Sequence, residues 1–168
     1  MKHEQQGFTF IELVVVLAIL AMVTALVWPR LPDTRGASLK SSARTLAATM
    51  RYLGEQVAVQ RQPYRLRFSP GSGEISVTVI TPGASETAPN DPFLNRRILA
   101  EGVTIADIQT PRLGTVGSGE VRIDIGPAGI PELTSIHLRE AAGRQMTVTA
   151  YPFGGRITVR EGYLEERL

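Results

Sequence analysis

The sequence predicts an α+β protein, in which a long N-terminal α-helix precedes an antiparallel, β-sandwich-like globular domain. Three observations predict this order. Residues 8–28 form an apolar run that carries one charge, Glu12. Between residues 39 and 58, apolar residues recur every three or four positions, which is the spacing of one helix face. From Tyr64 onward, apolar and polar residues alternate, which is typical of half-buried strands.

The composition excludes several classes of protein. The 168 residues include no cysteine, so disulfides, thiol catalysis and cysteine metal sites are excluded. The histidines are only His3 and His137, which excludes a multi-histidine metal site. The chain also lacks the residue spacing of a phosphate-binding loop and of a nucleophile elbow. We therefore predict a protein that is not an enzyme and that has no cofactor.

The N-terminal apolar run is long enough to cross a membrane, because roughly 20 apolar residues span a bilayer as a helix. Three interpretations compete: a secretory signal cleaved near residues 23–25, a permanent membrane anchor, and a buried globular helix. The charge of Glu12 bears on this choice, because a carboxylate at the bilayer centre costs roughly 2.5–3.5 kcal/mol or more. Glu12 therefore has either a partner or a shallow interfacial position without a role.

Residues 1–12, which read MKHEQQGFTFIE, resemble the class III leader of type IV pilins and of type II secretion pseudopilins. The shared pattern is a short polar start, a glycine, an aromatic residue, a threonine and a glutamate ahead of a continuous apolar helix. The resemblance implies that residues 1–7 are a leader peptide and that a prepilin peptidase cuts between Gly7 and Phe8. It also implies that this peptidase methylates the new amino group of Phe8.

The same resemblance implies two roles for the helix over residues 8–28. It is expected to anchor the chain in the bacterial inner membrane by a single pass, with the C-terminal domain in the periplasm. In a filament it is expected to pack against other pilins, with Glu12 paired to the Phe8 amine of a neighbouring subunit. The basic residues weakly favour the opposite orientation, because more of them follow the run than precede it.

Residues 29–62 are predicted to form a linker and an amphipathic continuation of the helix. Pro29 and Pro32 bend or interrupt the helix. Helical spacing resumes near residue 39, and the apolar stripe consists of Leu39, Ala43, Leu46, Ala47, Met50, Leu53, Val57 and Ala58. We expect this stripe to pack on the domain. The basic side chains of residues 30–67 favour a solvated face near anionic lipid headgroups over a nucleic-acid site.

Residues 63–168 are predicted to form the β domain. Seven segments alternate apolar and polar residues: YRLRFS, EISVTVIT, VTIADIQ, EVRIDIG, TSIHLRE, QMTVTAY and GRITVRE. Glycine-rich turns separate these segments, so we expect seven or eight antiparallel strands in a two-sheet sandwich. The stretch TPGASETAPNDPF, residues 81–93, is expected to be a mobile polar loop.

Two longer stretches extend the resemblance beyond the N-terminus. The helix and hairpin SSARTLAATMRYLGEQVAVQRQPYRLRF, and the C-terminal stretch from IDIGPAG to GGRITV, are similar to the GspH/FimT family of minor pilins. The shared features include a strand that ends in a proline and a glycine, residues 125–129, and a closing Gly-Arg-apolar-x-Val strand. Residues 83–109 match no recognised pattern. The resemblance implies a pilin-like fold.

Few side chains of the β domain suggest chemistry. His137 is interpreted as a strand histidine without a catalytic partner. The carboxylates Asp107, Glu120 and Asp124 lie in segments that alternate with apolar residues, which is typical of a solvent face. Convergence of these three carboxylates on a cation is the alternative, and we expect no metal.

Three functions compete. The first is a minor pseudopilin, a structural subunit of the periplasmic pseudopilus of a type II secretion system, which helps to export folded proteins across the outer membrane. The second is a minor type IV pilin in pilus assembly or DNA uptake, and the third is an anchored or secreted enzyme. The expected partners are prepilin peptidase, other pseudopilins or pilins, inner-membrane lipid and a secreted cargo. The C-terminal residues REGYLEERL are net acidic, which argues against DNA as a partner.

Overall fold

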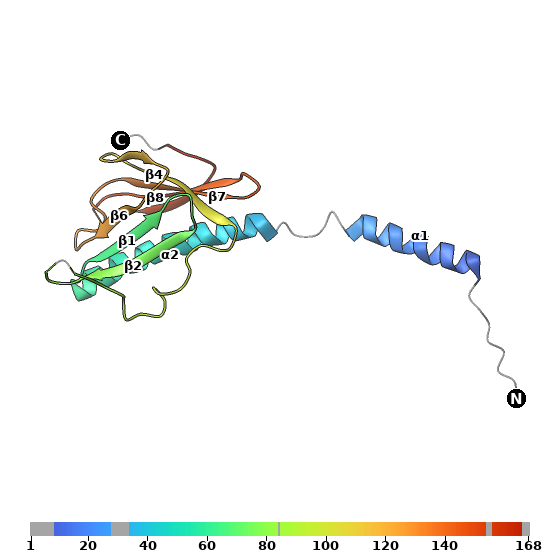
Figure 1. The fold of residues 1–168 in the computed structure, drawn as a ribbon, viewed down its shortest axis with the longest axis horizontal. Helices are drawn as coiled ribbons and strands as arrows, with labels where there is room; N and C mark the ends of the chain where they lie inside the picture. The colour runs from blue at the N-terminus through green and yellow to red at the C-terminus, as the bar shows by residue number, and fades with distance from the viewer. Residues whose placement is uncertain (1–8, 28–33, 84, 154–155, 166–168) are drawn as a thin grey trace, which may run out of the picture. The chain divides into compact units, whose positions relative to one another are not determined.

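Within the residues that the computed structural model of the chain describes, two helices precede nine strands (Figure 1). The structure describes residues 9–27, 34–83, 85–153 and 156–165. The chain divides into two units, Met1–Asp33 and Thr34–Leu168. The buried apolar core of the described residues lies wholly in the second unit.

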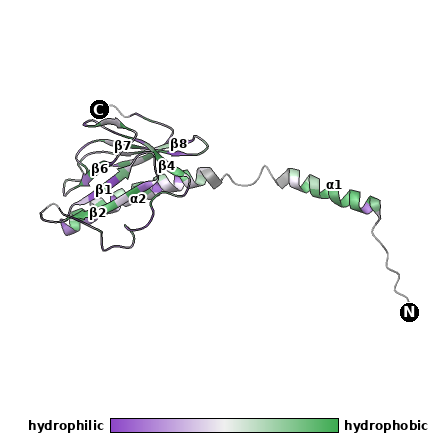
Figure 2. Cartoon of the chain, in the orientation of Figure 1, coloured by the Kyte–Doolittle hydropathy of each residue, from purple (hydrophilic) through white to green (hydrophobic). Residues whose placement is uncertain are grey.

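The first unit contains the helix α1, Phe10–Val27. Its described side chains are exposed to solvent, and most of them are apolar (Figure 2). Within the described part of the chain, no helix reaches the length and apolarity that crossing a membrane requires. The span predicted over residues 8–28 also includes Phe8 and Trp28, which lie outside the described residues.

The second unit begins with the helix α2, Thr34–Gln60. The helix starts before residue 39, where the predicted periodicity begins, and the two prolines 29 and 32 lie outside the described residues. Every member of the predicted stripe except Ala58 is buried, so the stripe is confirmed as core. Arg61 ends the helix with a left-handed φ of 55°, and its backbone N–H donates to the carbonyl of Val57 over 2.8 Å. This is a common helix ending, although a glycine usually occupies the left-handed position.

The nine strands form two antiparallel sheets. Sheet A has the order β3-β2-β1-β6, and sheet B has the order β5-β4-β7-β8-β9. The strands of sheet A are β1 Tyr64–Ser69, β2 Glu74–Ile80, β3 Glu86–Thr87 and β6 Val121–Ile125. Those of sheet B are β4 Val103–Thr110, β5 Gly114–Val116, β7 Thr134–Glu140, β8 Gln145–Ala150 and β9 Ile157–Glu161.

The predicted α+β class with two antiparallel sheets is confirmed. Each of the seven alternating segments forms a strand, and two short strands, β3 and β5, were not expected. Strands of two and three residues are too short for alternation to reveal them. The helix α2 packs mainly on β7, β8 and β9 of sheet B, and side chains such as Leu66 and Ile136 fill the core completely shielded from solvent. Burying an apolar side chain of this size stabilises the fold by about 1.5–3 kcal/mol.

The end of the segment predicted to be a mobile polar loop, residues 81–93, makes contacts that the sequence analysis did not expect. Asp91 accepts a hydrogen bond from the hydroxyl of Tyr52 over 2.6 Å, and the ring of Phe93 packs against the Tyr52 ring at 5.0 Å. The chain that follows then buries Leu94, Ile98 and Leu99. These contacts reach α2, which is distant in sequence, so polar composition did not reveal them. The mobility of the segment stays a prediction.

The turn between β1 and β2 joins the two sheets. The Gly71 N–H donates to the carbonyl of Ile105 over 2.7 Å, and the Ile105 N–H donates to the carbonyl of Ser72 over 2.9 Å. A Cβ on Gly73 would lie 2.8 Å from the carbonyl oxygen of Val103. Only glycine lets the turn approach the backbone of β4 this closely.

Candidate functional site

The predicted processing site lies at the N-terminus of α1. Gly7 and Phe8 are outside the described residues, so cleavage and methylation there stay predictions. Glu12 is described: it lies in the first turn of α1 with its side chain exposed. The predicted pairing of Glu12 with a neighbouring amine also stays a prediction.

Thr9 caps the start of α1, which the sequence analysis missed. The Glu12 N–H donates to the Thr9 hydroxyl oxygen over 3.3 Å, and the Leu13 N–H donates to the Thr9 carbonyl over 3.2 Å. Thr9 and Glu12 therefore stand at the N-cap and N3 positions of a Thr-x-x-Glu sequence, the pattern of a capping box. That pattern, directly before an apolar run, is the signal that could have located the helix start.

Most of the exposed large apolar side chains of the described residues lie on α1. Phe10 is 83% exposed and Met22 is 77% exposed, and the remaining large apolar side chains between them are also exposed, namely Ile11, Leu13, Val14, Val15, Val16, Leu17, Ile19 and Leu20. Contiguous apolar surface of this kind marks a contact with a protein or a membrane.

The outer face of sheet A carries a network of ion pairs. Arg65 binds Glu86 on one side, with 2.7 Å between Nη1 and Oε1, and Asp124 on the other, with 2.6 Å between Nε and Oδ1. Arg67 also donates to Glu86, and the Thr78 hydroxyl donates to the Glu86 carboxylate over 2.8 Å. These hydrogen bonds, from Thr78 first and then from the two arginines, lower the pKa of Glu86 to about 2.

The outer face of sheet B carries a different cluster, around His137. Its imidazole is fully buried, with Nδ1 2.6 Å from Asp107 Oδ1 and Nε2 3.1 Å from the carbonyl oxygen of Leu164. The ring of Tyr163 stacks on the imidazole at 3.8 Å with 22° between the ring planes. His137 is thus a strand histidine, as predicted, but it contacts the end of the chain, which the sequence analysis did not expect.

The three candidate carboxylates do not converge. Asp107 lies on β4 beside His137, whereas Asp124 lies on β6 and Glu120 just before it, where they pair with arginines of sheet A. Among the described residues, no group of three or more histidine, aspartate or glutamate side chains could hold a metal ion. Glu120 and Asp124 are therefore exposed to solvent, as predicted, whereas Asp107 is half-buried.

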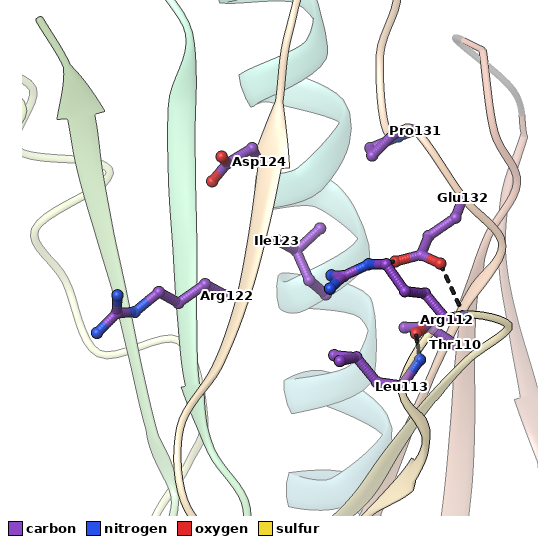
Figure 3. Close-up of a pocket in the computed structure, with 8 residues that line it drawn as sticks. All are labelled: Thr110, Arg112, Leu113, Arg122, Ile123, Asp124, Pro131 and Glu132. Carbon is purple, nitrogen blue, oxygen red and sulfur yellow. Dashed lines mark hydrogen bonds and ion pairs between the residues drawn. The ribbon is translucent and has the colours of Figure 1, made fainter. Parts of the chain in front are cut away.

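A cavity of about 320 Å³ lies between β6 and two loops of sheet B, one before β5 and one before β7 (Figure 3). Ile123 projects from β6 toward Arg112 and Glu132 on the opposite wall. The Arg112 backbone N–H and Nε both donate to the Glu132 carboxylate, over 3.2 and 3.3 Å. The other charged residues of the lining, Arg122 and Asp124, pair with Glu120 and Arg65. Each charged group of this lining is thus already paired with another side chain.

A second concave region, of about 370 Å³, lies along α2. Gly54 and Ala58 leave space on the helix beside Ile125, Pro127 and Ile157. Arg51 crosses one end and donates to the carbonyl of Ile157 over 2.6 Å. The lining is mixed, and it contains no pair of an acid and a base in hydrogen-bond contact among the contacts described.

Comparison with known proteins supports the N-terminal motif and the fold separately. Residues 2–28 match the family model of the prokaryotic N-terminal methylation motif. No curated protein matches the chain. Among solved structures, the minor pseudopilin EpsH from the type 2 secretion system of Vibrio cholerae matches 74% of this chain and 95% of its own, with a TM-score of 0.55 and 19% identity. At this identity the likeness shows the fold alone.

The motif and the fold agree with each other. The methylation motif spans residues 2–28, which include α1, and the solved structure matches 74% of the chain. The first comparison bears out the N-terminal methylation motif expected from the sequence, and the second bears out the pilin-like fold.

Proposed function

We propose that this pseudopilin-like chain is a minor pseudopilin, a structural subunit of the periplasmic pseudopilus of a type II secretion system. The observation that carries the proposal is the combination of a methylation motif over residues 2–28 with the fold of a minor pseudopilin behind it. In this role a prepilin peptidase cuts between Gly7 and Phe8 and methylates the Phe8 amine. The assembled filament helps to export folded cargo across the outer membrane.

The exposed apolar surface of α1 supports the same role. Before assembly, α1 and its flanking residues hold the chain in the bacterial inner membrane by a single pass, with the second unit in the periplasm. After assembly, the same surface packs against the helices of neighbouring subunits. This accounts for a helix whose large apolar side chains are exposed.

Glu12 sets the axial register of that packing. It lies four residues, roughly 6 Å along the helix axis, from Phe8. A carboxylate inside an apolar bundle is strongly destabilising when it is unpaired. Pairing with the Phe8 amine of a neighbour removes that penalty at one axial offset, so subunits that slip past one another lose the pair.

The contacts of the second unit support a structural role rather than catalysis. The charged side chains that line the cavity beside β6 are already engaged with one another or with sheet A. The Asp107–His137 pair binds the end of the chain instead of facing an open cavity. The proposed activity is therefore assembly and contact with neighbouring subunits or cargo.

A minor type IV pilin, acting in pilus assembly or DNA uptake, is the second candidate, because the methylation motif is not particular to secretion. The net acidic C-terminal residues argue against DNA contact at that end of the chain. The two candidates differ in the phenotype that loss of the chain produces. Deletion of the gene should abolish export of folded proteins and leave pili intact. Normal export combined with lost piliation would favour the second candidate.

The first experiment is the intact mass and the N-terminal residue of the chain purified from membranes that contain prepilin peptidase. We expect a chain that starts at N-methylated Phe8, and Gly7→Val should retain the leader. A start near residue 26 would instead indicate an ordinary secretory signal and would overturn the proposal.

Glu12→Ala tests the pairing itself. This variant raises the apolarity of α1 and leaves Gly7 intact, so membrane insertion and cleavage should be unchanged. Incorporation into filaments, measured by crosslinking to other subunits, should fall at least tenfold, since a lost buried ion pair costs several kcal/mol. Glu12→Gln is the matched control for side-chain size. Normal incorporation of both variants would contradict the pairing.

A further inference from the structure

We infer that His137 is held as the doubly protonated imidazolium, and that this charge fastens residues 162–165, the C-terminal tail, across the outer face of sheet B. This inference concerns the second unit alone and goes beyond the proposed function. It makes the tail a proton-dependent strap whose attachment is strongest while His137 is charged.

The hydrogen bonds of the imidazole carry the inference. Its Nε2 faces the Leu164 carbonyl oxygen at 3.1 Å, and a carbonyl oxygen can only accept a hydrogen bond. Its Nδ1 faces Asp107 Oδ1 at 2.6 Å, and an ionised carboxylate also only accepts. A neutral imidazole carries one N–H and satisfies one of these two acceptors, whereas the imidazolium satisfies both.

The alternative is a neutral imidazole beside a protonated Asp107. The hydroxyl of Tyr163 argues against it, because this hydroxyl also donates to Asp107 Oδ1, over 3.3 Å. Asp107 Oδ1 thus faces two groups that can donate to it, His137 Nδ1 and the Tyr163 hydroxyl. An ionised carboxylate accepts from both, whereas a protonated oxygen would lose one of these hydrogen bonds. Burial, and then the nearby Asp107 charge, raise the pKa of Tyr163, so its hydroxyl stays a donor.

The surroundings of His137 form one row across four strands. Asp107 on β4, His137 on β7, Thr147 on β8 and Arg160 on β9 are successive register partners and share the outer face. Asp107 is the carboxylate in contact with the imidazole. Among the described residues, the other charged groups on this side are Arg139, two residues along β7, and Glu165 in the tail; both are exposed. Within that part of the chain, the imidazolium therefore has one anionic partner in direct contact.

Thr147 holds the tail beside the imidazole. Its hydroxyl donates to the Gly162 carbonyl over 2.7 Å and accepts from the Leu164 N–H over 3.0 Å. Together, His137 and Thr147 bind three backbone groups of the tail, and Tyr163 covers the imidazole by stacking. A cation gains additional attraction from an aromatic face, so the stack also favours the charged ring.

Loss of the proton weakens this attachment. Once His137 is neutral, one of its nitrogens presents a lone pair to an acceptor, and either Asp107 or Leu164 loses its donor. The contribution to tail binding is therefore complete while His137 is protonated and falls as the pH rises through its deprotonation. Release of the tail would open the row of Asp107, His137 and Thr147 to solvent or to a neighbouring molecule.

The test uses residues 34–168, which form one compact unit and contain the buried apolar core of the described residues. His137 is the only histidine of that segment, because the other histidine is His3. Nitrogen-15 NMR of the single imidazole distinguishes the imidazolium from both neutral tautomers. We expect the imidazolium at pH 7, and Asp107→Asn should lower the pH at which it deprotonates. A neutral tautomer at pH 7 would overturn the inference.

Amide exchange of Leu164 reports on the tail itself, as protection relative to the intrinsic rate at each pH. Protection should be high at neutral pH and should fall at the pH where the imidazole signal shows deprotonation. In His137→Gln, which keeps one donor, protection should drop about tenfold or more. Arg139→Gln, on the same face, is the matched control and should match the parent. If the His137 variant is poorly folded, the parent's pH profile alone decides, and protection that does not change with the imidazole signal would refute the strap.

Discussion

The outer faces of the two sheets come from the same alternation of apolar and polar residues, but their surroundings differ. On sheet A, Arg65, Arg67 and Glu86 form ion pairs at a face that water reaches. On sheet B, His137 and Thr147 occupy equivalent alternating positions, yet they are 0% and 1% exposed. The C-terminal tail binds both side chains, and its Tyr163 stacks on the imidazole.

The difference shows what alternation does and does not predict. The period of two identifies the residues that point away from the core. It does not state whether a further segment of chain covers them. On a covered face, polar side chains must hydrogen-bond to one another or to the covering segment, because water does not reach them. Sheet B therefore carries a few buried hydrogen bonds where sheet A carries exposed ion pairs. The two faces should therefore respond differently to substitution.

The largest expected effect is on the covered face. His137→Ala removes the donors to Asp107 and Leu164 and leaves a half-buried carboxylate unpaired, so the free energy of unfolding should fall by about 3 kcal/mol. Urea denaturation of residues 34–168 measures it. Arg139→Ala, exposed on the same face, should change stability by less than about 0.5 kcal/mol. Equal losses in the two variants would mean that the covering of this face has no energetic consequence.

A smaller effect is expected on the open face. Arg65→Met removes the paired hydrogen bonds to Asp124 and the contact to Glu86 while it keeps most of the side-chain length. Because water screens such pairs, the free energy of unfolding should fall by no more than about 1 kcal/mol. The loss should shrink further in concentrated salt. A loss as large as that of His137→Ala would show that the open face is not solvated in the way described.

The smallest effect concerns pH. The pKa of Glu86 is lowered from an ordinary 4.5 to about 2, so its ionised form is the one that the folded chain favours. That contribution is complete above about pH 5 and is lost as the pH falls toward 2. Melting temperatures of the parent and of Glu86→Gln should thus differ by a constant gap from pH 5 to 8. The gap should close between pH 4.5 and 2, and a gap that widens there would contradict the assigned direction.

Much of the fold was predictable because it follows from local periodicity. The stripe from Leu39 to Val57 and the seven alternating segments appear in the structure as α2 and seven strands. The candidate sites were less predictable, because they depend on contacts between distant residues. His137 meets Asp107 and Leu164, which lie 30 and 27 positions away along the chain. One local signal was the pair Tyr163 and Leu164 inside a mostly charged C-terminal stretch, which suggests a tail that packs.

The cap at Thr9 has a consequence for the order of events in maturation. The hydrogen bonds that start α1 come from Thr9 and the residues after it, so a cut after Gly7 leaves the helix start intact. The cut also places a new positive amine close to the helix end that already carries the positive pole of the peptide dipoles. On the proposed function, the Glu12 carboxylate of a neighbouring subunit pairs with this amine. The covalent step that exposes the amine therefore also creates the group that assembly requires.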